Sequence, residues 1–221
     1  MSELLGPGPH TRVRRLPEKA RYDESTIYSI LDEARMCHVA ALIEGRAVAL
    51  PTLHARVGRR IYLHGSRSNA VLAALVTEGR AWITATIYDG LRLARSGFES
   101  SIAYRSVVVE GPAREVIDEA HKRRILDHFV DAVLPGRANE VRAMSDRELR
   151  LTSVIEVEID EASAKVSEGP TDDDSNDQDL AIWSGVIPAR LVFGDPVASS
   201  DGAMAAGDIE VPLSVRRLLD Q

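Results

Sequence analysis

A run of polar residues after an expected strand has the composition of an anion-binding site. It joins the strand at 60–64 to a helix expected over 69–78, and it contains His64, Gly65, Ser66, Arg67, Ser68 and Asn69. Free backbone N–H groups at the first turn of a helix attract anions, together with the helix dipole. Arg67 adds a charge suited to phosphate. An ordinary capped helix explains these residues equally well, so both interpretations stay open here.

A second candidate is the irregular strand that contains Pro51, Thr52, Leu53 and His54. Proline within a strand is typical of an edge or a bulge, where unpaired backbone groups face outward. Such groups can meet the polar rim of a planar heterocycle, although a plain edge strand is the simpler interpretation of this run alone. His54 is the candidate for proton transfer or substrate contact, because imidazole changes charge near neutral pH. A solvent-facing strand histidine is the alternative.

Two further segments carry arginine, serine and aromatic groups. The long connection over 92–106 contains Arg95 and Arg105, each followed by serine, and connections of this length are often functional. Trp183 comes just after an acidic run, where it can belong to the core or cover the ring of a cofactor. Taken alone, these arginines are ordinary surface charges and this tryptophan an ordinary core side chain.

Familiar signatures of metal and nucleotide sites are missing. The sequence has no Walker-type or dinucleotide-type glycine loop, no pair of cysteines and no His-Glu-x-x-His. His54 and His64 are expected on neighbouring strands, but no third ligand lies near them, so we expect no metal site. Cys37, the single cysteine, begins an apolar run, which favours a buried and inert thiol.

The charge is concentrated in one segment. The formal net charge is −7, and residues 168–179 contain six acids with no lysine or arginine. We interpret this segment as a solvated loop, with metal binding as the weaker alternative. The remainder is near neutral, so we expect no nucleic-acid partner. No apolar run reaches the ~20 residues of a membrane helix, residues 1–21 do not resemble a secretory signal, and one cysteine fits a reducing cytosol. We therefore expect a cytoplasmic protein.

Periodicity predicts the elements that position these groups. Helices are expected at 23–34, 69–78 and 118–133 and near residue 212, and six or seven strands lie between them at hairpin spacing. They include a hairpin around Gly111-Pro112 and a half-exposed strand at 152–159. This is an α+β pattern, an antiparallel barrel with peripheral helices. We expect an extended arm at 1–21, one domain at 22–195, and a linker with a short helix at 196–221.

The ordered set of segments resembles the pyridoxamine 5′-phosphate oxidase-like family, particularly the branch of the nitroimidazole-resistance proteins. No single motif is decisive, but their order from about residue 12 to 195 is specific. The matching segments are Arg14–Pro17, Tyr22-Asp23, Ile30–Ala34, Cys37–Ala40, Leu50–Leu53, Leu63–Ser66, Asp89–Leu91, Leu93–Ser96, Tyr104–Val108, Pro135–Arg137, Ser163–Val166 and Trp183–Pro188.

The resemblance implies a split β-barrel homodimer with FMN in the groove between subunits. The strand Pro51–His54 would lie along the isoalloxazine, and the loop 64–69 would hold the ribityl phosphate. Tyr104, Arg105 and Ser106 would approach the cofactor, and Trp183 would close the site. The implied activity is reduction of a small electrophile through flavin N5, or flavin exchange with NAD(P)H. A flavin-binding sensor without turnover, and a barrel using heme or deazaflavin, are the alternatives.

Three departures from the family pattern bear on activity. Many relatives have Ser-Arg at the positions of Asn69 and Ala70, so the usual phosphate arginine is missing and Arg67 is its candidate replacement. Relatives often have two histidines and an asparagine in the stretch that reads Phe98–Ser106 here. The lysine and the C-terminal Arg-x-His of true pyridoxamine-phosphate oxidases are also missing. We therefore do not expect vitamin B6 oxidation.

Overall fold

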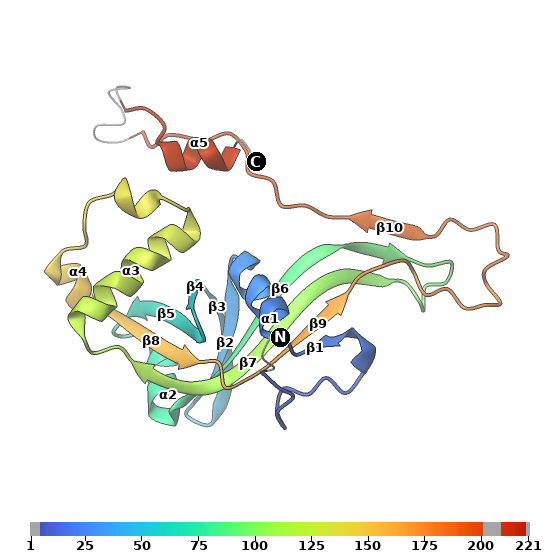
Figure 1. The fold of residues 1–221 in the computed structure, drawn as a ribbon, viewed down its shortest axis with the longest axis horizontal. Helices are drawn as coiled ribbons and strands as arrows, with labels where there is room; N and C mark the ends of the chain where they lie inside the picture. The colour runs from blue at the N-terminus through green and yellow to red at the C-terminus, as the bar shows by residue number, and fades with distance from the viewer. Residues whose placement is uncertain (1–4, 201–208, 220–221) are drawn as a thin grey trace.

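An antiparallel sheet forms the body of the molecule in this computed structural model, which describes residues 5–200 and 209–219 (Figure 1). Over these residues the sheet has ten strands in the order β3-β2-β6-β7-β8-β5-β4, with β9 on β7, β1 on β9 and β10 on β6. The strands are β1 Ala20–Arg21, β2 Cys37–Ile43, β3 Arg46–Thr52, β4 His54–Val57, β5 Arg60–Ser66, β6 Arg80–Leu93, β7 Ser101–Glu115, β8 Thr152–Glu158, β9 Glu161–Ser167 and β10 Gly185–Pro188. This confirms the α+β, antiparallel interpretation.

Helices surround the sheet, and their starts follow the expected capping chemistry. They are α1 Glu24–Glu33, α2 Ala70–Glu78, α3 Glu119–Val133, α4 Asp146–Leu151 and α5 Leu213–Leu219, with 3₁₀ turns at η1 Pro17–Lys19 and η2 Arg137–Asn139. The side chains of Asp23, Asn69 and Asp118 each accept a hydrogen bond from a backbone N–H of the helix that follows. Within the described residues, no helix is both long and apolar enough to cross a membrane.

Strand β7 is continuous where the sequence predicted a hairpin around Gly111-Pro112. It pairs first with β6 and β9 and then, beyond Gly111, with β8. A Cβ on Gly111 would overlap the carbonyl oxygen of Glu158, so only glycine allows the two backbones to approach this closely. The Gly-Pro pair therefore lies within the strand, at the place where β7 passes from one part of the barrel to the next.

The core is divided into two clusters. The larger lies inside the barrel and against α1 and α2, where Ile27, Leu63, Ile83 and Val107 are at most 1 % exposed. The smaller lies beneath α3 and α4 and includes Phe129. Each such side chain contributes about 1.5–3 kcal/mol on burial. Cys37 is fully buried, as its apolar neighbours predicted, and desolvation raises its pKa to about 12, which disfavours the reactive thiolate.

Strand β8 is buried on both faces, whereas its alternating acids predicted a half-exposed strand. Glu156 is 5 % exposed because it lies on the face covered by α3. Its carboxylate accepts hydrogen bonds from the Tyr62 hydroxyl at 2.8 Å and from Arg114. Burial raises the pKa of Glu156, but these bonds and the charges of Arg114 and Arg60 lower it by more. Paired cations thus allow an acid to occupy an interior position.

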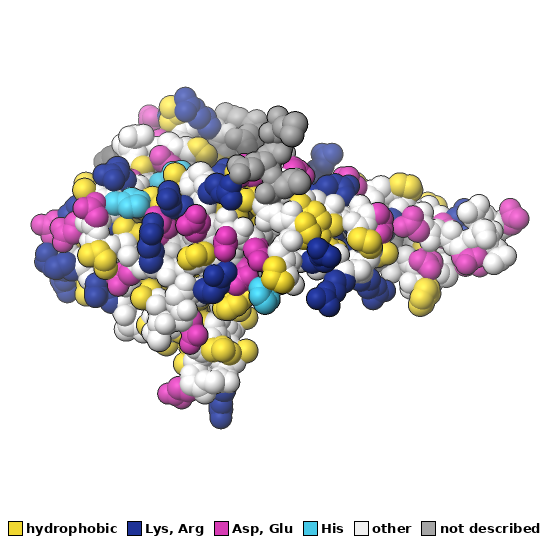
Figure 2. Space-filling view, turned by 60° about the horizontal axis from the view of Figure 1, so that its bottom comes forward, with side chains coloured by type: hydrophobic (Ala, Val, Ile, Leu, Met, Phe, Trp, Pro, Cys, Tyr) yellow, Lys and Arg dark blue, Asp and Glu magenta, His cyan; other side chains and the backbone are white. Residues whose placement is uncertain are grey.

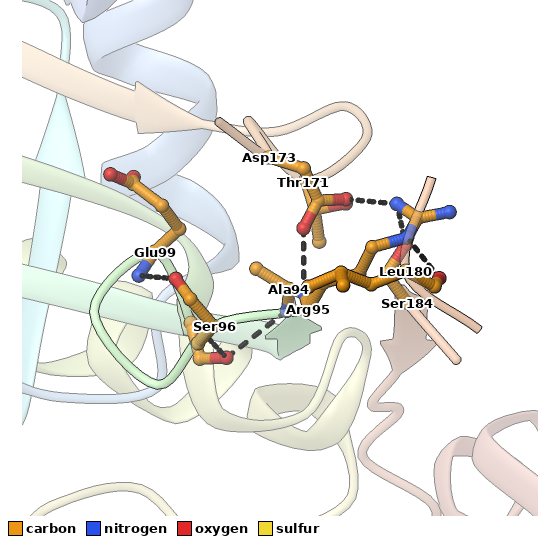
Figure 3. Close-up of polar contacts among 9 residues, drawn as sticks. Ala94, Arg95, Ser96, Glu99, Thr171, Asp173, Leu180 and Ser184 are labelled. Carbon is orange, nitrogen blue, oxygen red and sulfur yellow. Dashed lines mark hydrogen bonds and ion pairs between the residues drawn. The ribbon is translucent and has the colours of Figure 1, made fainter. Parts of the chain in front are cut away.

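The acidic segment at 168–179 is only partly a solvated loop. The Asp173 carboxylate accepts hydrogen bonds from the backbone N of Arg95 at 2.5 Å and from its guanidinium at 2.6 Å (Figure 3). The same guanidinium donates to the hydroxyl of Ser184, and Arg92 holds Asp172 at 3.2 Å. The solvated-loop interpretation was therefore wrong for Asp173, whose side chain is 8% exposed, whereas Asp172 pairs with Arg92 but stays 78% exposed. Sequence alone did not show that these arginines face the loop across the projecting end of β6 and β7.

The two ends of the chain are placed differently: the N-terminal arm packs into the barrel, whereas the C-terminal segment runs away from it. Leu5, in the expected N-terminal arm, is 3 % exposed and belongs to the barrel core. On the other side, β10 pairs with the projecting end of β6, and the chain then runs back across the molecule toward α5 (Figure 1). Part of the expected linker at 196–221, residues 201–208 and 220–221, lies outside the described residues.

Candidate functional site

Most backbone donors of the loop 64–69 are used within the protein. The Asn69 side chain accepts hydrogen bonds from the backbone N of Val71 at 2.9 Å and of Leu72 at 3.2 Å, so it caps α2. The backbone N of Arg67 donates to the carbonyl of Leu151. These are the contacts of the capped-helix interpretation. An anion at this loop would therefore be held mainly by the Arg67 guanidinium and by the exposed hydroxyls of the two serines beside it.

A cavity of about 320 Å³ lies beside this loop and contains charges that the sequence did not single out. Arg67 from the loop, Lys122 from α3 and Arg150 from α4 line it, together with Glu115 and Glu119. Lys122 is only 6 % exposed. Burial lowers its pKa and so does the charge of Arg67, while the two glutamates oppose this shift. Lys122 and Arg150 lie far from the loop in sequence, and no local motif marks them.

His54 lies inside the protein, next to α1. It follows Pro51 and Thr52, which lie at the end of β3, the edge strand of the sheet, as the proline predicted. Its Nε2 forms a 2.8 Å hydrogen bond with the carbonyl of Leu31, and its Nδ1 is buried with no partner in the described part of the chain. Burial lowers the pKa of His54, so the ring is neutral at pH 7. It is not a solvent-facing histidine, and its catalytic role stays a prediction.

The two histidines of the neighbouring strands do not meet. His54 pairs with Leu63, so His64 lies on the opposite face of β5. There its ring packs against Phe129 with centroids 4.3 Å apart, and its Nδ1 is buried without a partner among the described residues. Burial lowers the pKa of His64 as well. No group of three potential metal ligands occurs in residues 5–200 and 209–219.

Arg105 anchors a second and larger space, a groove of about 1010 Å³. Its guanidinium donates to both carboxylate oxygens of Asp89 at 2.8 and 2.9 Å, and to both of Glu33 at 2.5 and 2.7 Å. These pairs lower the pKa of Glu33 and raise that of Arg105. Tyr104 and Ser106 alternate with Arg105 along β7, so their side chains lie on the other face of the strand.

The remaining walls of this groove are largely apolar and aromatic. The end of α1, the middle of β6, the segment 189–193 and the end of α5 form them. Met36, Tyr88 and Phe193 line the groove, and each side chain is about half exposed. The Arg35 guanidinium lies 5.6 Å from the centre of the Phe193 ring. Arg190 lines it too and makes no ion pair within the described chain. An apolar groove with cations suits a planar aromatic ligand that carries negative charge.

Trp183 lies apart from both spaces. It is 66 % exposed and lines neither the cavity nor the groove. It comes just before β10, which pairs with β6 at the projecting end of the molecule, whereas α3 and α4 lie at the opposite end (Figure 1). Within one chain the structure therefore does not bring Trp183 to the loop 64–69, and its expected place over a cofactor stays a prediction.

Comparison with known proteins assigns the family. The sequence profile described as pyridoxamine 5′-phosphate oxidase matches residues 23–166. The chain belongs to this family. The match covers β2 to β8, the loop 64–69, Arg105 and all but the last residue of β9, and it confirms the resemblance drawn from the ordered motifs. No protein with a curated description matches the chain.

Two solved structures resemble this member of the family over almost its whole length. The flavocytochrome Anf3 from Azotobacter vinelandii is 34% identical, with a TM-score of 0.89, over 96% of this chain and 97% of that one. An FAD- and heme-binding protein from Mycobacterium smegmatis is 35% identical, with a TM-score of 0.84, over 90% and 97%. A putative 5-nitroimidazole antibiotic resistance protein from Bacteroides thetaiotaomicron is 23% identical, with a TM-score of 0.57, over 66% and 86%, which shows the shared fold.

Proposed function

We propose that this protein is a flavin-binding redox protein that also binds heme. The observation that carries the proposal is the pairing of a basic cavity at the loop 64–69 with a large apolar groove at Arg105. One space suits a phosphate and the other a planar ring system. Support comes from the two relatives above 30% identity, a flavocytochrome and an FAD- and heme-binding protein.

The residues present fit a flavin nucleotide. The Arg67 guanidinium and the hydroxyls of Ser66 and Ser68 are exposed and would meet a phosphate, although the hydroxyls bond to each other at 2.9 Å and Arg67 lies 3.7 Å from Glu115. Pro51 and Thr52 end an edge strand, which leaves backbone groups for the polar rim of the ring. The bound flavin would supply hydride or electron transfer, and the protein would orient it and set the charge around it.

The groove also fits a heme. Met36 and Tyr88 are the two groove-lining residues whose side chains are of types that ligate heme iron. Arg35 and Arg190 line the same space and would pair with the carboxylates of the propionates. Leu191, Val192 and the Phe193 ring would exclude water from the porphyrin. Arg105 would not serve as a propionate partner, because Glu33 and Asp89 already saturate its guanidinium.

FAD is the flavin that we propose, although the family resemblance first implied FMN. The reason is that the FAD- and heme-binding relative matches 90% of this chain at 35% identity. Reduction of a small electrophile, with NAD(P)H as the class of electron donor, stays part of the proposal, as does the role of His54 in proton transfer. His54 lines neither the cavity nor the groove, so in that role its buried ring would act on a flavin that lies along its own strand and would not exchange protons with solvent.

We also propose that the protein works as a homodimer in the cytoplasm. The segment after β10 exposes large apolar side chains: Val197 is 95% exposed and lies outside the groove, and Leu191 at 73% and Val192 at 80% would be covered by the heme, the partner subunit or both. Figure 2 shows further hydrophobic side chains among charged ones along the projecting end. Apolar surface of this extent is typical of an interface between subunits. Light scattering coupled to size-exclusion chromatography should give twice the chain mass, and a single-chain mass at micromolar concentration would refute the dimer.

The absorbance spectrum of freshly purified protein tests the cofactors. We expect flavin bands together with a Soret band, and FAD rather than FMN when the released flavin is separated by chromatography. FMN alone would restore the cofactor that the resemblance implied, and a spectrum with heme but no flavin would favour the heme-barrel alternative. If neither cofactor is retained after reconstitution with FAD, FMN and hemin, the proposal is wrong.

A further inference from the structure

A lysine without a partner faces the cavity beside the loop 64–69. Lys122 is 6 % exposed, and its ammonium makes no hydrogen bond or ion pair within residues 5–200 and 209–219. Removing a charge from water without a partner is costly, so buried lysines are normally paired. Here the neighbouring charge of Arg67 adds to the cost, because two cations repel each other. The cavity thus presents a positive charge that no group of the described residues pairs, and a small anion would neutralise it.

Three separate elements bring positive charge to this cavity. Arg67 comes from the loop between β5 and α2, Lys122 from the first turn of α3, and Arg150 from the last turn of α4. The loop is tied to the end of α4, because the backbone N of Arg67 donates to the carbonyl of Leu151 at 3.1 Å. The cations thus sit on anchored backbone and would need little movement to surround a small ligand.

The two acids that line the cavity do not neutralise it. Glu115 lies 3.7 Å from Arg67 and also accepts a hydrogen bond from Ser153 at 3.1 Å, so it is already engaged. Glu119 opposes the shift in the pKa of Lys122, but its carboxylate is not within ion-pair distance of the lysine. Three cations against two carboxylates leave an excess of positive charge around a space of about 320 Å³.

We propose that this cavity binds a phosphate group of the flavin nucleotide, with Lys122 and Arg150 supplying charge that the loop 64–69 lacks. The inference rests on the proposed function and deepens it. In the loop, Asn69 is used as a helix cap and the backbone N of Arg67 is bonded to Leu151, which leaves the Arg67 guanidinium as the only cation of the loop. Cations from α3 and α4 therefore supplement Arg67, and they determine whether a phosphorylated flavin binds more tightly than riboflavin.

Binding of three flavins to the flavin-depleted, full-length protein tests this proposal. Riboflavin has no phosphate, FMN has one and FAD has two, so the series separates recognition of phosphate from recognition of the ring. The variants are Lys122→Met and Arg150→Gln, and flavin fluorescence gives the dissociation constants. The matched controls are Arg124→Met on α3 and Arg147→Gln on α4, exposed arginines of the same helices that do not line the cavity.

We expect each cavity variant to weaken binding of FMN or FAD by about tenfold or more, and to leave riboflavin and both control variants unchanged. Arg150 is exposed, so its replacement should not disturb folding even if that of Lys122 does. Equal weakening of all three flavins, or no weakening by either cavity variant, would overturn the phosphate assignment while the flavin proposal stands. Wild-type protein that binds none of the three would overturn both. Free phosphate that competes with FMN only in proteins with an intact cavity would support the site.

Discussion

Replacing Arg105 with methionine should lower the free energy of unfolding by about 2 kcal/mol. Two guanidinium nitrogens of Arg105 donate to the two carboxylate oxygens of Asp89, and the two side chains are only 28% and 32% exposed. We therefore assign this pair about 1.5 kcal/mol, as for hydrogen bonds to charged groups. Glu33 is 53% exposed, and solvent screening reduces its pair to about 0.5 kcal/mol. For a chain of this size, the total corresponds to a fall in Tm of about 4–8 °C.

The same link makes the effect depend on pH. Hydrogen bonds from Arg105 lower the pKa of Glu33 in the folded protein, against a smaller opposing effect of burial. A carboxylate with a lowered folded pKa stabilises the fold above its unfolded pKa, about 4.3, and this stability is lost as pH falls through the folded pKa. The difference between wild type and Arg105→Met should therefore be complete at pH 7 and decrease below about pH 4. Urea unfolding at pH 7 and pH 3.5 measures it.

A matched surface pair provides the control. Arg142 also binds one carboxylate, that of Glu148, through two hydrogen bonds at 2.5 and 2.9 Å, but its side chain is 72% exposed. We expect Arg142→Met to leave the urea midpoint unchanged, because solvent screens exposed pairs. If Arg105→Met unfolds at the same urea concentration as wild type at pH 7, or loses no more than Arg142→Met, burial does not strengthen the groove network and the reasoning is refuted.

Three further predictions concern stability and the C-terminal segment. Tyr62→Phe should lower the free energy of unfolding by about 1.5–2 kcal/mol in urea, since its hydroxyl donates to the buried carboxylate of Glu156. Tyr28→Phe loses a partly buried bond to Glu24, one turn earlier in α1, and should cost less than half as much. Gly90→Ala should release β10 from β6, because a Cβ at this position would overlap the carbonyl oxygen of Ile187. We expect faster proteolysis of the chain after residue 180 at an unchanged Tm. An unaltered cleavage rate would contradict this prediction. Burial lowers the pKa of His54, so stability should be complete above its unfolded pKa of about 6.5 and fall at lower pH by up to about 1.4 kcal/mol per unit. His54→Asn should flatten this slope, and a variant with the wild-type slope would show that His54 carries none of it.

Local sequence patterns were enough to predict the fold class and the places of several helices and strands. Apolar periodicity and capping residues predicted the helices at 23–34, 69–78 and 118–133, because these signals act over a single turn. Pro51 predicted an edge strand for the same reason, since proline cannot donate to a neighbouring strand. The order of short motifs predicted the family, and the matched profile confirmed it.

Tertiary structure decided the features that depend on close approach between distant segments. Gly111 lies within a continuous strand because the backbone at Glu158 passes too near for a side chain, which no local pattern could show. Arg92 and Arg95 bind acids about 80 residues away, and Glu156 is buried because α3 covers its face of β8. The candidate phosphate site depends on the same kind of contact. Arg67 was visible in sequence as part of a loop. Lys122 and Arg150 join it only because the first turn of α3 and the last turn of α4 meet at one cavity, where like charges are held together in partial isolation from water.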